Sequence, residues 1–174
     1  MAVRYAVKLD KVHEALGLKS GIRVNGWRLE NPLDANARHH GTITNSKSEL
    51  FIENPPEHQS RHKDHYSTKL VALLSNGGEK ALVLKRFKDS AEPQSRIDWV
   101  RQNKSKLAVT GVTPVALIAD REILIHPYQG GRKLTEDQQI DLLVKLDENG
   151  LASHNAIEHG HFRIDEKGIH LIPA

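Results

Sequence analysis

The chain has 174 residues, a length typical of a single domain. Apolar residues make up 38% of the composition and charged residues 27%, a balance that excludes an intrinsically disordered chain and predicts a buried core. The absence of cysteine excludes disulfides, thiolate zinc sites and cysteine nucleophiles. The formal net charge of +3 is ordinary for a small domain, so it does not indicate a nucleic-acid partner.

The sequence also bears on cellular location. No stretch approaches the roughly 18 consecutive apolar residues that a membrane-spanning helix needs. The segment 1–5 lacks the charged, apolar and small-residue regions of a signal peptide. We therefore expect a soluble, cytoplasmic protein that does not insert into a membrane.

The first third of the chain is predicted to hold one helix, one hairpin and one strand. Apolar residues at helical spacing predict a short helix that begins at Leu9 and ends before Gly17. Residues 22–29 predict a β-hairpin around Asn25-Gly26, because this dipeptide favours positive φ at both turn positions. Residues 49–53 predict a strand. Two polar segments are predicted to be loops: 31–48 and 54–68.

Two further hairpins are predicted with a helix between them. Residues 69–75 and 79–87 are nearly continuous in apolar character, which predicts an antiparallel hairpin with both faces covered. Ser90 is a suitable N-cap for the helix that follows. Residues 112–119 and 122–126 predict the second hairpin.

The last third is predicted to contain a helix and a hairpin. Thr135 and Gln138 have the spacing of a capping box, and Gly150 is suited to end the helix. Four apolar residues are predicted to form its buried face: Ile140, Leu142, Leu143 and Leu146. Residues 161–164 and 169–172 then predict two short strands.

From residue 69 onward the chain resembles a protein kinase. The order of hairpin, helix, hairpin, glycine-containing segment, helix, polar loop and hairpin is similar to the kinase fold from its second strand to its eighth. Four local sequences carry the resemblance. Ala81–Lys85 resembles the third kinase strand, and Ile123–Gly131 resembles the fifth strand with the hinge. His154–Asp165 resembles the catalytic loop, and Gly168–Pro173 resembles the strand before Asp-Phe-Gly.

The resemblance implies an α+β, protein-kinase-like fold in a single truncated domain. It predicts an antiparallel small-lobe sheet with one packed helix, followed by a truncated larger lobe. Residues 1–68 would hold the N-terminal helix, hairpin and loops, residues 69–128 the small-lobe core, and residues 129–174 the reduced large lobe.

The same resemblance implies ATP as the cofactor. It places four residues against a nucleotide: Lys85, His126, Tyr128 and Gly130. The competing interpretation of Lys85 is a lysine at the exposed end of a strand, and that of Gly130 is a plain turn. We expect ATP binding, if it occurs, to be weak, because the segment before residue 69 has no glycine-rich loop to approach phosphates.

Three departures from the kinase pattern bear on catalysis. Two residues after His154, the position of the catalytic aspartate holds Ala156. The position of the magnesium-binding asparagine holds His161, and the position of the Asp-Phe-Gly aspartate holds Pro173. Since imidazole and proline do not replace oxygen ligands for a hard cation, we expect neither a bound metal nor phosphoryl transfer.

The sequence therefore predicts a catalytically impaired, kinase-like binding or regulatory protein with a protein partner. Its size is also similar to small kinase-like effectors that bacterial pathogens inject into host cells, which adds secretion into a host as an alternative location. One alternative function is an active minimal kinase or nucleotidyl transferase that holds metal through Glu158 or Asp165. Another is a basic nuclease or toxin that depends on His154 and His161.

The histidines near the C-terminus also allow a metal-site interpretation. Four of them follow one another closely, with Glu158 among them: His154, His159, His161 and His170. Their spacing matches no helical metal motif, and loop histidines on a solvated surface are the simpler interpretation.

Overall fold

The computed structural model describes residues 3–17, 27–30, 42–46, 48–54, 68–153, 157 and 160–173. The chain divides into two compact units. The first consists of Met1–Ser95 and Ala116–Tyr128, and the second of Arg96–Val115 and Gln129–Ala174. Most strand pairs are antiparallel and helices pack beside them, so the predicted α+β class is confirmed.

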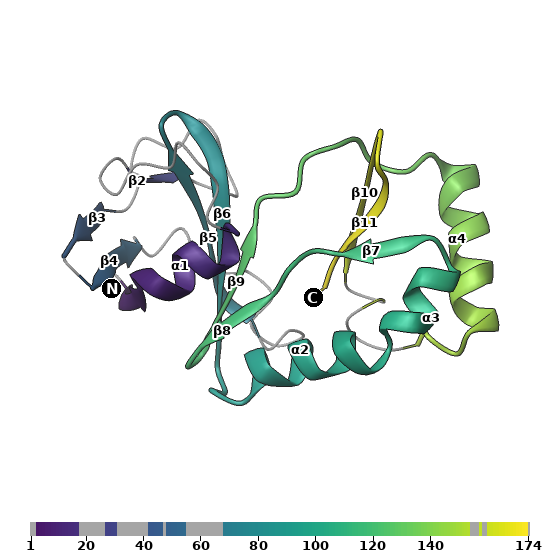
Figure 1. Cartoon of the computed structure of the whole chain (residues 1–174), viewed down its shortest axis with the longest axis horizontal. Helices are drawn as coiled ribbons and strands as arrows, with labels where there is room; N and C mark the ends of the chain where they lie inside the picture. The colour runs from purple at the N-terminus through teal and green to yellow at the C-terminus, as the bar shows by residue number, and fades with distance from the viewer. Residues whose placement is uncertain are drawn as a thin grey trace. The chain divides into compact units, whose positions relative to one another are not determined.

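The first unit contains two antiparallel sheets (Figure 1). Strands β1, β4 and β3 form the N-terminal sheet, and strands β2, β5, β6, β9 and β8, in that order, form the larger sheet. The elements of this unit are β1 (Val3–Lys8), α1 (Leu9–Ala15), β2 (Trp27–Glu30), β3 (Thr42–Asn45), β4 (Glu49–Asn54), β5 (Thr68–Asn76), β6 (Glu79–Phe87), β8 (Ile118–Asp120) and β9 (Ile123–Pro127).

The second unit combines helices with a small mixed sheet (Figure 1). Strands β10 and β11 form an antiparallel hairpin, and β7 pairs in parallel with β11; these strands are called the C-terminal sheet. Its elements are α2 (Glu92–Gln102), which begins in the first unit, α3 (Lys104–Val109), β7 (Val112–Pro114), α4 (Glu136–Glu148), β10 (His161–Asp165) and β11 (Gly168–Ile172).

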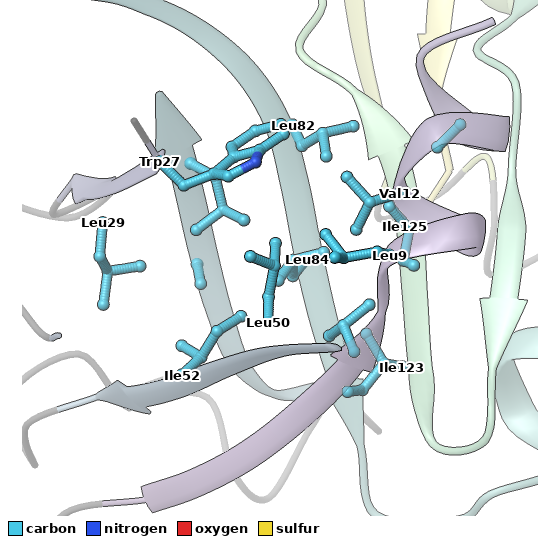
Figure 2. Close-up of a cluster of buried hydrophobic side chains, with 14 of the residues drawn as sticks. Leu9, Val12, Trp27, Leu29, Leu50, Ile52, Leu82, Leu84, Ile123 and Ile125 are labelled. Carbon is cyan, nitrogen blue, oxygen red and sulfur yellow. The ribbon is translucent and has the colours of Figure 1, made fainter. Parts of the chain in front are cut away.

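The core of the first unit lies between the larger sheet, the N-terminal sheet and α1. Figure 2 shows Leu84 of β6 beside Leu50 of β4, and Leu9 of α1 directed toward Ile125 of β9. Hydrogen bonding adds to this packing, because Asp120 at the end of β8 accepts from a backbone N–H at the end of β1 at 2.9 Å. The helix that packs against the larger sheet is therefore α1 and not the predicted helix after β6, because α2 beyond Ser95 belongs to the second unit.

Side chains are buried on both faces of the larger sheet. Leu82 and Leu84 lie on the face that meets the core just described. Lys85 and Phe87 lie on the opposite face and are also buried, as is Leu124 on the neighbouring strand. On the neighbouring strand β5 the successive residues Leu73 and Leu74 are both buried, so the prediction that both faces of the β5–β6 hairpin are covered is confirmed.

The second unit has its own core, to which the ends of α4 contribute. Thr135 and Gln138 form the predicted capping box. At the other end Gly150 has φ of 70° and donates to Asp147, while the Leu151 N–H donates to Leu146. This Schellman arrangement turns the chain so that Leu151 joins the buried cluster that contains Leu146.

Four features of the described chain differ from the sequence-based predictions. A first strand, β1, precedes α1, and β3 lies within the segment 31–48 that was predicted to be a loop. Residues 112–119 do not form one strand: β7 joins the C-terminal sheet, and only β8 pairs with β9. At the start of α2, Asp89 rather than Ser90 accepts a backbone N–H, from Ala91 at 2.9 Å. The predicted turn at Asn25-Gly26 lies outside the described residues.

The buried face of α4 is the clearest correction. Leu142 and Leu146 are buried as predicted, but Ile140 and Leu143 are 56% and 51% exposed. At 100° per residue these four positions span an arc of about 160°, and only the side of that arc with Leu142 and Leu146 meets the core. Helix α4 therefore has two apolar faces, of which only one is covered within the described chain.

No helix in the described part of the chain is both long enough and apolar enough to cross a membrane.

The capping box of α4 provides a test of this local structure. Replacing Thr135 with Ala leaves the Gln138 N–H without its side-chain acceptor, so we expect the free energy of unfolding to fall by about 1 kcal/mol. Thr135→Ser retains the hydroxyl and should cost much less. Urea denaturation measures both variants, and equal losses would contradict the capping role.

Candidate functional site

Lys85 and His126 lie together on the buried face of the larger sheet that carries Phe87. Strand pairing sets Val83 opposite His126 and Lys85 opposite Leu124, so all four side chains share that face. Lys85 is 8% exposed and His126 is 1% exposed. Lys85 is thus not a lysine at the exposed end of a strand, which corrects the simpler interpretation of this residue.

The hydrogen bonding of His126 identifies its tautomer. Its Nδ1 lies 2.7 Å from the carbonyl oxygen of Pro127, which only accepts, so Nδ1 carries the proton and donates. Burial, followed by the nearby charge of Lys85, lowers the pKa of His126 from 6.5 to about 3, and the bond to Pro127 opposes this shift. The imidazole is therefore neutral at physiological pH and its buried Nε2 is a lone-pair acceptor with no protein donor within the described residues.

The other two residues predicted to contact a nucleotide lie elsewhere. Tyr128 is 40% exposed, and its N–H donates to the Ala81 carbonyl at 2.8 Å, which extends the β6–β9 pairing. The ammonium of Lys80 lies 5.3 Å from the centre of the Tyr128 ring. Because this backbone N–H is already used, it is not available to an adenine ring, as the hinge interpretation requires. Gly130 belongs to the second unit.

The adjacent glycine, Gly131, has a packing role. It has φ of 108°, and a Cβ at this position would lie 2.8 Å from the carbonyl oxygen of Ile164. The close approach allows Arg132 and Ile164 to exchange two backbone hydrogen bonds of 3.0 and 2.9 Å. Gly131 thus attaches the segment before α4 to strand β10.

A second polar cluster lies on the C-terminal sheet. The Nε2 of His170 lies 2.9 Å from Oδ1 of Asp165, and the Lys167 N–H donates to the same oxygen. The hydrogen bond from His170, supported by those from Lys167 and Gln129, holds the pKa of the Asp165 carboxyl below its usual range. Asp165 is thus an anionic acceptor that orients the His170 ring.

Strand register adds further polar residues to this face. Arg163 lies directly opposite His170 on the neighbouring strand, and Thr113 of β7 lies opposite His170 on the other side. His161 and Asp165 share the face because they lie two residues to either side of Arg163. Phe162, Ile164 and Leu171 occupy the opposite face and pack into the core of the second unit.

The predicted positions of the catalytic loop and the metal ligands are described only in part. His161 is exposed at the start of β10, and Pro173 is buried just after β11. His154, Ala156, Glu158 and His159 lie outside the described residues. Among the residues that are described, no three histidine or carboxylate side chains are grouped so that they could hold a metal ion.

The pairing of Asp165 with His170 was not predicted, although both residues had been singled out. The sequence contained a signal for this pairing. An aspartate at the start of a four-residue turn between two strands lies close to the strand that follows the turn. The proximity of Lys85 to His126 depends instead on the register of two strands far apart in sequence.

No protein-family model, curated protein or solved structure matches this chain.

The buried imidazole of His126 predicts a specific pH dependence of stability. Its pKa in the folded state, about 3, is below the unfolded value of 6.5, so the unfolded chain takes up the proton first and stability is lost as pH falls below 6.5. The loss from this group between pH 7 and pH 5 is about 2 kcal/mol.

Asn is a suitable replacement because its amide can donate to Pro127 and does not titrate. For His126→Asn, urea denaturation at both pH values should give a loss smaller by about 2 kcal/mol than in the unchanged chain. Equal pH dependence in the two proteins would show that His126 is not held neutral by the fold.

Proposed function

We propose that this chain is a catalytically impaired, kinase-like protein that acts by binding a protein partner. The observation that supports the proposal is Lys85, which lies near the end of the second strand of the β5–β6 hairpin and is buried beside strand β9. In the kinase pattern a lysine at this point of the third strand contacts the nucleotide phosphates.

The residues at the catalytic positions support the loss of activity. Ala156 has no base, and Pro173 has no oxygen in its side chain. His161 offers imidazole, which is a poor ligand for Mg²⁺. A kinase-like protein without these catalytic groups would still have a folded surface that a partner protein can bind. We also propose that the protein is secreted into a host cell.

An ATP titration tests this proposal. We expect a Kd weaker than about 1 mM with magnesium, because the oxygen ligands that would hold a metal–triphosphate complex are replaced. At about 1 mM ATP the melting temperature should then rise by about 1 °C or less. Calorimetry with and without magnesium, together with a thermal-shift assay, measures both quantities.

A larger ATP-dependent shift would contradict the loss of nucleotide function. So would transfer of labelled phosphate to any protein substrate, provided that Lys85→Met abolishes the transfer. The Lys80→Met variant is the matched control, because Lys80 lies on the same strand but is exposed.

A second candidate function is favoured by the Asp165–His170 pair. A carboxylate that holds Nε2–H of an imidazole leaves Nδ1 as a base, which is the arrangement used in general acid–base catalysis. Arg163 and His161 on the same face supply a cation and a second imidazole, as cleavage of a phosphodiester needs. This arrangement supports the histidine-dependent nuclease, with His170 rather than His154 as the central residue.

Incubation with RNA and with DNA tests this second candidate. We expect cleavage that falls at least tenfold in His170→Asn and in Asp165→Asn, while His13→Asn on α1 leaves it unchanged. Intact nucleic acid after prolonged incubation, or equal cleavage by all of these variants, would exclude the candidate.

A further inference from the structure

Helix α4 carries an exposed apolar surface that the core of the second unit does not use. Ile140, Leu143 and Val144 are 56%, 51% and 51% exposed. They are spaced i, i+3 and i+4, so their side chains are neighbours on one face of the helix. This surface, defined by these three residues, is called the α4 apolar face. The buried residues Leu142 and Leu146 are centred about 130° around the helix from this face.

The α4 apolar face is bordered by carboxylates at both ends. Glu136 and Asp137 lie one turn before Ile140, and Asp147 and Glu148 lie one turn after the other two apolar residues. With Asp141 these make five carboxylates against one ammonium group, Lys145, so the helix has a net charge of −4 within a chain of net charge +3. Lys145 is paired with Asp141 at 3.1 Å.

We propose that the α4 apolar face binds a basic amphipathic helix of a partner protein. Apolar residues at helical spacing on the partner would cover the α4 apolar face, and Lys or Arg side chains at either end would meet the carboxylates. The proposal deepens the proposed function, on whose protein partner it rests, by naming the chemistry of that partner.

Charge decides between this occupant and two others. A second copy of the chain packed through α4 would bring two helices of net charge −4 together, with Lys145 already paired within each helix. An anionic membrane surface would be repelled by the same carboxylates. A basic segment is attracted by them, and its binding must therefore weaken as salt screens the charges.

A defined peptide provides the test. The probe is a fluorescein-labelled amphipathic helix built only from Leu and Lys, and binding to the full chain is followed by fluorescence anisotropy at two salt concentrations. A matched peptide of Leu and Glu is the control ligand. We expect the Lys peptide to bind, the Glu peptide not to bind, and the affinity of the Lys peptide to fall at least several-fold as salt is raised.

Substitutions on α4 localise the binding. Leu143→Gln with Val144→Gln removes most of the α4 apolar face from exposed positions, and it should weaken binding at least tenfold. Asp147→Asn with Glu148→Gln removes two carboxylates at the end of the helix, where negative charge is unfavourable, so folding is preserved. This second variant should bind several-fold more weakly and with less dependence on salt.

Val109→Gln is the matched control. Val109 is an equally apolar side chain, 75% exposed, at the end of α3, a helix with lysines and no carboxylates. Its replacement should leave binding unchanged.

Three outcomes would overturn the proposal. They are unchanged binding by both α4 variants, equal binding of the Glu peptide, and a concentration-dependent dimer that Leu143→Gln with Val144→Gln abolishes. The last result would assign the α4 apolar face to a second copy of the chain. The assay contains no ATP, so a positive ATP titration would contradict the kinase-like proposal without affecting this result.

Discussion

Burial of both faces of the larger sheet is the constraint on which the first unit depends. Strand β6 alternates its side chains, so that Leu82 and Leu84 meet α1 and the N-terminal sheet while Lys85 and Phe87 are buried on the other face. A strand buried on one face only would have left Lys85 in water. Because the sheet is covered on both faces, a lysine and a neutral histidine lie together where charge is costly.

The second unit depends on how α4 begins and ends. The capping box fixes its first turn, and the turn at Gly150 brings Leu151 into the core beside Leu146. With both ends fixed, the rotation of the helix about its axis is also fixed. The remaining apolar residues then face outward, among the carboxylates, and form the surface that we assign to a basic partner.

The two polar clusters differ in the chemistry that they permit. At the Lys85–His126 pair the imidazole is buried and neutral, which suits binding or specific packing rather than proton transfer near pH 7. At the Asp165–His170 pair the imidazole is oriented by an anionic carboxylate on a more accessible face, which suits acid–base chemistry. The first cluster belongs to the kinase-like proposal and the second to its competitor, so the two functions can be tested separately.

The sequence by itself determined features whose causes are local. Capping residues set the start of α4, turn residues set the hairpins at residues 76–79 and 165–168, and apolar spacing set α1. In each of these elements the interactions are between residues close in sequence, so they form whatever the rest of the chain does. Only the tertiary structure decided which apolar side of α4 is buried, that β7 leaves its predicted hairpin for a parallel pairing with β11, and that Lys85 lies beside His126. Each of these outcomes is set by contacts between segments far apart in sequence, and no local pattern contains the register or the packing that selects them.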